Sequence, residues 1–224
     1  MLILALDTAL SAATAVVARD DRVLAVRCQE MARGHQEAIA VLTQAAMAEA
    51  GAAFEALDRI GVVVGPGSFT GLRVGLAFAK GLALAWDTSL IGIGALEALF
   101  ASVGIASAGD GRIVAAIDAG RGQVYLQTGG PPEQHPIAEA LELVSAFGPE
   151  VIVGSGAALL AAAAPDARID GRGFADPAAL ARLTLAAPAP GEPPRPLYLR
   201  TPDARTLAER GLADRGLAER GGVR

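Results

Sequence analysis

Short apolar runs alternate with longer segments of helical apolar period along the first hundred residues. Three β-prone runs come first, at residues 2–7, 13–18 and 22–28. Because only turn-length gaps separate these runs, they predict a three-stranded meander. Residues 35–50 then repeat apolar side chains at helical spacing, and Gly51 follows as a C-cap signal. This segment is therefore expected to form an amphipathic helix.

The remaining pattern predicts further strands and helices in both halves of the chain. In the first half we expect a strand at 59–65, a turn and helix within 65–83, a strand at 89–94 and a helix at 95–103. In the second half we expect a hairpin from 112–118 and 122–128, a Pro-rich loop at 129–136, and a strand at 151–154 that leads into an Ala-rich helix. Asp176 and Pro177 carry the N-cap and first-turn signals of a last helix.

Two segments repeat one local pattern. "LILALDTALSAATAVVA" and "RIVAAIDAGRGQVYLQ" both run strand, Asp, small-residue turn, strand. This repetition predicts a duplicated α/β architecture, with Asp7 and Asp118 facing each other across a cleft between the halves. We expect an N-terminal subdomain at 1–105 and a C-terminal subdomain at 106–200, in which 187–196 is a stiff linker. A charged low-complexity tail with repeats of the "LAERG" type occupies 201–224.

Composition narrows the classes of protein that fit. Of the 224 residues, 52% are hydrophobic but only 4% are aromatic, so the core is built mainly of small side chains. The net charge of −5 leaves no global positive field to hold a polyanion, so a second component would have to hold most of any nucleic acid. Cys28 is the one cysteine, which excludes an internal disulfide, and its alternating apolar run predicts inert packing. We expect neither a signal peptide nor a membrane anchor, and a cytoplasmic location.

The stretch "GPGSFTGLRVGLAFAKGLA" at 65–83 resembles several glycine-rich motifs but matches none of them strictly. Its glycines and Lys80 are misplaced for a phosphate-binding loop, a dinucleotide fingerprint or a nucleophile elbow. Pro66 and Gly67 predict a tight turn, and Ser68 or Thr70 a helix cap. Glycine or alanine then recurs at every fourth residue, which predicts a flat groove for the helix at 35–50 or for a helix of another chain. A weak anion site at the start of this helix stays open.

Candidates for catalysis are few. His35 and His135 are the only histidines, and no H-x-x-x-H or H-E-x-x-H pair is present to hold a metal on a helix. Asp7 and Asp118 could organise magnesium and phosphate in the cleft. They could equally cap their own turns, which is a common role of Asp. The residues alone leave both interpretations open.

Four segments together resemble one bacterial family. The start "ILALDTALSAATAVV", the block "VGPGSFTGLRVGLAFAKGLA", the hairpin "AIDAGRGQVY" and the late "PLYLR" are similar to the TsaB family, also called YeaZ, over residues 1–200. The resemblance implies an α/β protein with an actin-like ATPase-domain (ASKHA) fold, in which two subdomains are each built from a duplicated strand hairpin plus helices. It also implies a non-catalytic activating subunit of the machinery that attaches threonylcarbamoyl to adenosine 37 of tRNAs reading codons that begin with A.

The same resemblance implies partners and sites. The expected partners are the catalytic paralogue TsaD, the nucleotide-dependent third subunit TsaE, tRNA through the complex, and a second copy of the chain when it is alone. No catalytic residue, metal or cofactor is expected on this chain. The expected partner interface is Gln36, Ile39, Ala40, Thr43, Met47, Gly71, Leu72, Gly75, Leu76 and Ala79. A vestigial nucleotide cleft is expected at Asp7, Thr8, Asp118 and Gly120.

One departure and two alternatives qualify this expectation. Nucleotide-binding members of the fold carry D-x-G-T in the first hairpin, but this chain has Asp7, Thr8 and Ala9 and lacks the glycine that approaches phosphate. ATP binding by the chain itself is therefore not expected. The main alternative is a free-standing ATP-dependent kinase or ATPase that uses Asp7 and Asp118. A peptidase is a third alternative, and the missing metal pair argues against it.

Overall fold

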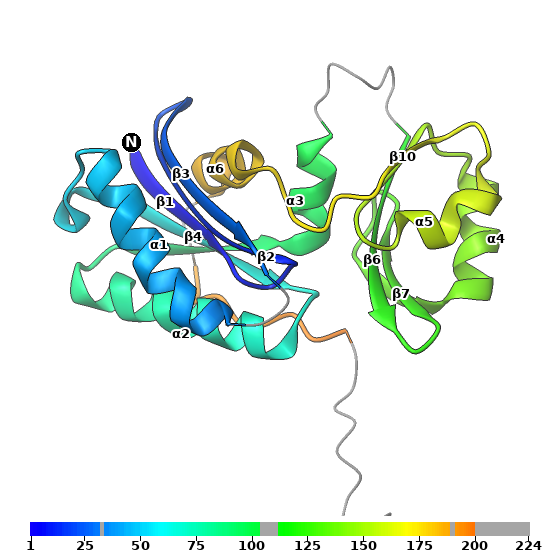
Figure 1. Ribbon diagram of the computed structural model, residues 1–224, viewed down its shortest axis with the longest axis horizontal. Coiled ribbons are helices and arrows are strands. Elements are labelled where there is room, and N and C mark those ends of the chain that lie inside the picture. Colours follow the sequence, from blue (N-terminus) through cyan, green and yellow to red (C-terminus); the bar gives the residue numbers. More distant parts are fainter. Residues whose placement is uncertain (32–33, 104–111, 189–190, 200–224) are drawn as a thin grey trace, which may run out of the picture.

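Two five-stranded sheets lie side by side in the computed structural model, which describes residues 1–31, 34–103, 112–188 and 191–199 (Figure 1). The first sheet has the strand order β3-β2-β1-β4-β5. Its strands are β1 (Leu2–Asp7), β2 (Ala12–Arg19), β3 (Arg22–Glu30), β4 (Arg59–Gly65) and β5 (Ser89–Gly94). The meander β1 to β3 is antiparallel, whereas β4 and β5 run parallel to β1.

The second sheet repeats this topology. Its order is β10-β9-β6-β7-β8, with an antiparallel meander β6 to β8 and with β9 and β10 parallel to β6. Its strands are β6 (Ile113–Gly120), β7 (Gln123–Gln127), β8 (Glu133–Pro136), β9 (Val151–Val153) and β10 (Arg168–Asp170). The duplicated order confirms the predicted two-part α/β architecture and is that of the actin-like ATPase-domain fold.

Helices cover both faces of the first sheet. α1 (His35–Glu49) and α2 (Phe69–Ala85) pack on one face, and α3 (Ala95–Ser102) and α6 (Pro177–Ala186) on the other (Figure 1). α4 (Ile137–Phe147) and α5 (Ala157–Leu160) cover the outer face of the second sheet. α3 also contacts β6 and β7, so its buried side chains join both sheets in one hydrophobic core. No helix in the described part of the chain is long and apolar enough to cross a membrane.

The predictions for the first half are confirmed, and those for the second half are incomplete. Residues 129–136 are not only a loop, because Glu133–Pro136 forms β8, which pairs with β7 at the edge of its sheet. α4 and β10 are also absent from the sequence-based prediction. The polar composition of β8 hid it, because a short edge strand needs no alternating apolar pattern.

α6 and the described residues near 197 return to the first sheet, although the sequence placed them in the second subdomain. α6 packs on β1, β2 and β4, and Arg59 Nη1 donates a hydrogen bond of 2.5 Å to the Ala187 carbonyl just after this helix. The Leu197 N–H donates to the Val64 carbonyl at 2.7 Å, so the chain just after the predicted stiff linker is bound to β4. The predicted boundary between residues 105 and 106 and the tail at 201–224 lie outside the described residues.

Cys28 is exposed, so the prediction of inert packing was wrong. It lies on β3, an edge strand, and accepts a hydrogen bond of 3.3 Å from Thr14 Oγ1. An alternating pattern predicts two faces for a strand but does not say whether a helix covers the second face at that position.

The glycines of α2 have a different neighbour from the predicted helix. A Cβ atom on Gly71 would lie 1.9 Å from the Thr8 carbonyl oxygen, and one on Gly75 would lie 2.3 Å from Thr8 Oγ1. Thr8 Oγ1 donates a hydrogen bond of 2.7 Å to the Gly71 carbonyl. The groove therefore receives the turn between β1 and β2, because only glycine lets this turn approach the helix so closely.

We expect Gly71→Ala to lower the free energy of unfolding by about 2–3 kcal/mol, since the new methyl group would overlap a backbone carbonyl that cannot easily move. Gly81→Ala is the matched control on the same helix, where a Cβ atom would meet nothing within 4 Å. It should stabilise the protein by about 0.5–1 kcal/mol through helix propensity. Urea unfolding monitored by circular dichroism measures both. Equal effects of the two substitutions would contradict the close contact.

Candidate functional site: the cleft between the two sheets

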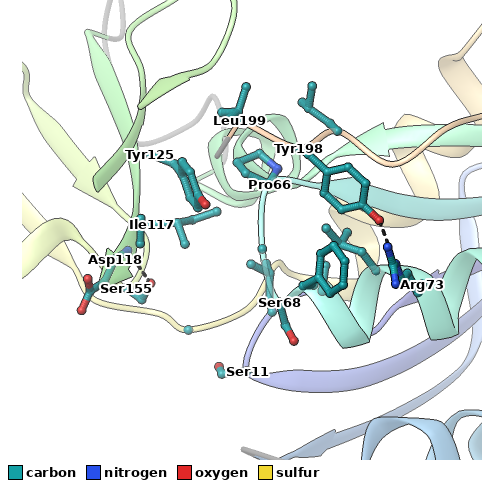
Figure 2. A pocket seen from close by; sticks show the side chains of 18 residues that line it. Ser11, Pro66, Ser68, Arg73, Ile117, Asp118, Tyr125, Ser155, Tyr198 and Leu199 are labelled. Atoms are coloured by element: carbon teal, nitrogen blue, oxygen red, sulfur yellow. Dashed lines mark hydrogen bonds between the residues drawn. The ribbon is translucent and has the colours of Figure 1, made fainter. Parts of the chain in front are cut away.

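A cleft of about 810 Å³ lies between the two halves of the molecule (Figure 2). The first half contributes the β1–β2 turn, the start of α2 and residues 197–199. The second half contributes the end of β6, Tyr125 of β7, and Ser155. The walls are mainly apolar, formed by Leu10, Pro66, Leu72, Ile117, Tyr125, Leu197 and Leu199. The polar groups at the edge are mostly hydroxyls, from Ser11, Ser68 and Ser155.

The start of α2 is bound to the first hairpin. Ser68 is the N-cap of the helix, as predicted, and its Oγ accepts a hydrogen bond of 3.3 Å from the Gly71 N–H. The Ser68 N–H in turn donates to the Ala9 carbonyl at 2.8 Å. A Cβ atom on Gly67 would lie 2.5 Å from this same carbonyl oxygen. The turn and the helix therefore form one rigid wall of the cleft.

The N–H groups of the first turn are used inside the protein. Asp7 Oδ1 accepts a hydrogen bond of 2.7 Å from the Ala9 N–H, and the Leu10 N–H also bonds to this carboxyl group. The Ser11 N–H donates to the Gly173 carbonyl at 3.1 Å. Three successive N–H groups that could face a bound anion are thus already engaged.

Asp7 is a buried carboxyl group and does not line the cleft. Its side chain is 1% exposed, and Oδ2 has no hydrogen-bond partner among the described residues. Burial raises the pKa of Asp7 from 3.8 to about 6, against the smaller lowering effect of the two backbone hydrogen bonds. The expectation that Asp7 and Asp118 face each other across the cleft was therefore wrong, because the turn folds inward against α2.

The second hairpin holds its aspartate differently. Asp118 is exposed at the edge of the cleft, where Oδ1 accepts a hydrogen bond of 2.7 Å from the Gly120 N–H. The Asp118 N–H donates to Ser155 Oγ at 3.1 Å (Figure 2). Gly120 has φ +69°, a left-handed conformation that favours glycine. Both aspartates therefore cap their own turns, which is one of the two roles left open by the sequence.

The residues predicted for a partner interface mostly face the interior of the chain. Ala40 is half-buried, and Gln36 lies in the first turn of α1. The other eight are buried: Ile39, Thr43, Met47, Gly71, Leu72, Gly75, Leu76 and Ala79. The helical period identified the core-facing stripe of each helix. On the opposite side, Val41 of α1 is 64% exposed and Leu84 of α2 is 87% exposed.

A cluster at the mouth of the cleft was missed by the sequence reasoning. The Arg73 guanidinium lies 3.7 Å from the centre of the Phe69 ring, and Arg73 Nε donates a hydrogen bond of 3.2 Å to Tyr198 Oη (Figure 2). The Phe69 and Tyr198 rings are 5.2 Å apart between centres. Since 125 positions separate Arg73 from Tyr198, no local pattern could bring them together.

His135, the second histidine, lies on β8, two residues before α4, and does not line the cleft. Its Nδ1 is 2.9 Å from Glu139 Oε1, and its Nε2 is 3.2 Å from Glu133 Oε2. These contacts join β8 to α4. The described residues around the cleft contain no histidine that could act as a base beside Ser68.

Comparisons with known proteins agree with this architecture. A family model described as TsaD: tRNA N6-adenosine threonylcarbamoyltransferase matches residues 25–141, slightly more than half of the chain. An uncharacterized protein of Mycobacterium tuberculosis is 35% identical over 92% of this chain and 95% of its own length. The Escherichia coli tRNA threonylcarbamoyladenosine biosynthesis protein TsaB is 35% identical over 56% of this chain and 53% of its own length.

The solved structures give the same fold. An uncharacterized protein from Pseudomonas aeruginosa, described as similar to peptidase YeaZ, superposes with a TM-score of 0.74 at 24% identity, covering 89% of this chain and 99% of its own. The duplicated sheets, the cleft and the family match define an actin-like protein related to the threonylcarbamoyltransferases. Within that class, the chain belongs to the TsaB (YeaZ) family.

The pH dependence of stability tests the burial of Asp7. Because its pKa in the folded protein is raised to about 6, the folded state holds a proton that the unfolded state has already lost between pH 4 and pH 6. Wild-type stability should therefore fall as pH rises through this window, by up to about 3 kcal/mol relative to Asp7→Asn. Above pH 7 and below pH 3.5 the difference should be constant.

Urea unfolding of both proteins from pH 3 to pH 8 measures this difference. Asp118→Asn is the matched control, because its carboxyl group makes the same hydrogen bond to a turn N–H but is exposed to water. A free-energy difference for Asp7→Asn that did not change with pH would show that Asp7 is solvated in the folded protein.

Proposed function

We propose that this chain is the non-catalytic activating subunit of the complex that attaches threonylcarbamoyl to adenosine 37 of tRNAs reading codons that begin with A. Membership of the TsaB family connects it to tRNA threonylcarbamoyladenosine biosynthesis. The catalytic subunit in this proposal is a TsaD-type paralogue, on which the adenosine amine attacks threonylcarbamoyl-adenylate and AMP leaves. This chain contributes binding and conformational support to that subunit.

The proposal of a non-catalytic role is supported mainly by one observation, which is that the first hairpin does not fit a nucleotide phosphate. A triphosphate needs free N–H groups or cations at the turn. Here the Ala9 and Leu10 N–H groups bond to Asp7, and the Ser11 N–H bonds to Gly173. The hydroxyls and the Asp118 carboxylate that line the cleft supply no positive charge. Arg73, the one cation among the described lining residues, lies at the mouth beside Tyr198 and not at the turn, so the cleft suits a less charged occupant than magnesium-ATP.

The outward face of α1 and α2 supports partner binding. Val41 and Leu84 are large apolar side chains in contact with water. Gly81 lies between Ala77 and Ala85 on the exposed side of α2, and its missing side chain has no neighbour within 4 Å. A mid-helix glycine costs about 0.5–1 kcal/mol relative to alanine, and nothing within the described chain requires it there. A partner helix that approaches closely would use this gap.

The proposal extends to assembly. We expect this face to bind the TsaD-type subunit, and to pair with a second copy of the chain when that subunit is absent. TsaE would join the resulting pair, and tRNA would be held mainly by the other subunits, because this chain carries a net charge of −5. We place this complex in the cytoplasm, where tRNA is modified.

The alternative is a free-standing kinase or ATPase that uses Asp7 and Asp118. Burial of Asp7 and the engaged turn N–H groups argue against it. Calorimetry of the purified chain with magnesium-ATP separates the two proposals. Micromolar binding without any partner would favour the kinase, and absence of heat together with activation of TsaD would favour the subunit.

We expect Leu84→Asp to weaken co-elution with the cognate TsaD-type protein at least ten-fold, because a carboxylate would be desolvated at the apolar face. Threonylcarbamoyladenosine formation on unmodified tRNA, with threonylcarbamoyl-adenylate supplied, should fall in parallel. Leu143→Asp is the control, since Leu143 is 41% exposed on α4 of the other half. Wild-type activity of Leu84→Asp, or unchanged product when the chain is omitted altogether, would contradict the proposal.

A further inference from the structure

The Phe69–Arg73–Tyr198 cluster has the form of a stacking platform. Phe69 is 49% exposed and Tyr198 is 44% exposed, although large aromatic side chains are usually buried. The Arg73 guanidinium lies over the Phe69 ring, and the Tyr198 hydroxyl accepts a hydrogen bond from its Nε. Two contacts therefore hold a flat cation in place at the surface.

The remaining groups of Arg73 are available for a ligand. Among the described residues no carboxylate forms an ion pair with Arg73, and its side chain is exposed. A guanidinium plane stacks on a base with one face while its N–H groups donate to phosphate or base oxygens. The Phe69 ring and the Tyr198 hydroxyl fix the orientation of the Arg73 guanidinium. The Arg73 side chain would therefore lose little conformational entropy when a ligand binds.

The cleft next to the platform can receive a flat, largely apolar group. All three residues of the cluster also line this cleft, whose apolar wall includes Leu72 and Leu199 (Figure 2). Its volume of about 810 Å³ is several times that of a single nucleobase. Ser11, Ser68 and Ser155 provide hydroxyls that can bond to the edge of a base. Asp118 on the far side would repel a phosphate, so the backbone of a ligand would stay on the Arg73 side.

The charge of the protein decides which form of nucleic acid fits. A duplex is held through many phosphates by a basic surface, and the chain has a net charge of −5. An unpaired nucleotide needs only an aromatic or guanidinium plane and one cation. The cluster offers both.

We propose that the Phe69–Arg73–Tyr198 cluster stacks one unpaired nucleotide of a tRNA loop, with its base in the cleft and its phosphate beside Arg73. This proposal rests on the proposed function for the identity of the RNA. It makes the chain a direct, local contact for tRNA in addition to its role as a partner of the catalytic subunit. Base and phosphate are recognised on one side of the cleft only.

The test uses the full chain, alone and mixed with the cognate TsaD-type protein. The probes are a fluorescent anticodon stem-loop and a blunt duplex of equal length. Ultraviolet crosslinking with mass spectrometry should place the stem-loop on Phe69 or Tyr198, and anisotropy should show weaker binding of the duplex. Arg73→Lys, which keeps the charge, and Tyr198→Leu, which keeps the apolar volume, should each weaken stem-loop binding about ten-fold.

Two controls complete the design. Arg112→Lys makes the same substitution at an exposed arginine of the second half that does not line the cleft, and it should bind like the wild type. Tyr198→Phe keeps the ring and should retain most of the affinity even if Tyr198→Leu destabilises the fold. Crosslinks elsewhere, no stem-loop binding, equal duplex binding, or unchanged affinity of Arg73→Lys would each overturn the proposal.

The same samples separate this proposal from the proposed function. Loss of co-elution with the TsaD-type protein in Arg73→Lys, with unchanged stem-loop affinity of the chain alone, would assign the cluster to a protein interface and overturn the RNA contact. If the wild-type chain failed to co-elute with the TsaD-type protein but the stem-loop still crosslinked to Tyr198, the result would count against the proposed function alone.

Discussion

The contact between Thr8 and α2 is the constraint on which the rest of the structure depends. The Thr8 carbonyl and hydroxyl occupy the space that side chains at 71 and 75 would fill. Since the turn lies this close to the helix, the Ser68 N–H can bond to the Ala9 carbonyl and hold both elements as one wall of the cleft. The turn N–H groups are directed to Asp7 and Gly173 instead of toward a ligand.

The two hairpins show how the same local pattern leads to different chemistry. Asp7 and Asp118 each accept a hydrogen bond from the N–H two residues later. α2 covers the first turn, so Asp7 is desolvated and its pKa is raised. The second turn is open, and Cβ atoms at Gly120 and Gly122 would meet nothing within 4 Å. The first hairpin is therefore closed and the second is exposed.

Two surfaces of α2 then acquire separate roles in our proposals. The outward face near its end carries Leu84 and the unexplained Gly81, and suits a protein partner. The first two turns carry Phe69 and Arg73 beside the cleft, and suit a base. Because one rigid helix bears both surfaces, binding of a partner at one end can position the other end toward tRNA without a change in fold.

Local pattern determined much of this architecture. Alternating and helical periods predicted the meander of the first half, the N-caps Ser68 and Asp176, and the duplication of the hairpin, because each depends on residues near in sequence. Only the tertiary structure decided which side of α1 and of α2 is buried. It also brought Thr8 into the glycine groove, α6 back to the first sheet, and Tyr198 into contact with Arg73. These features arise from contacts between segments that are far apart in the sequence. The free energy gained by burying two distant segments against each other depends on both, so it cannot be predicted from the residue pattern of either one.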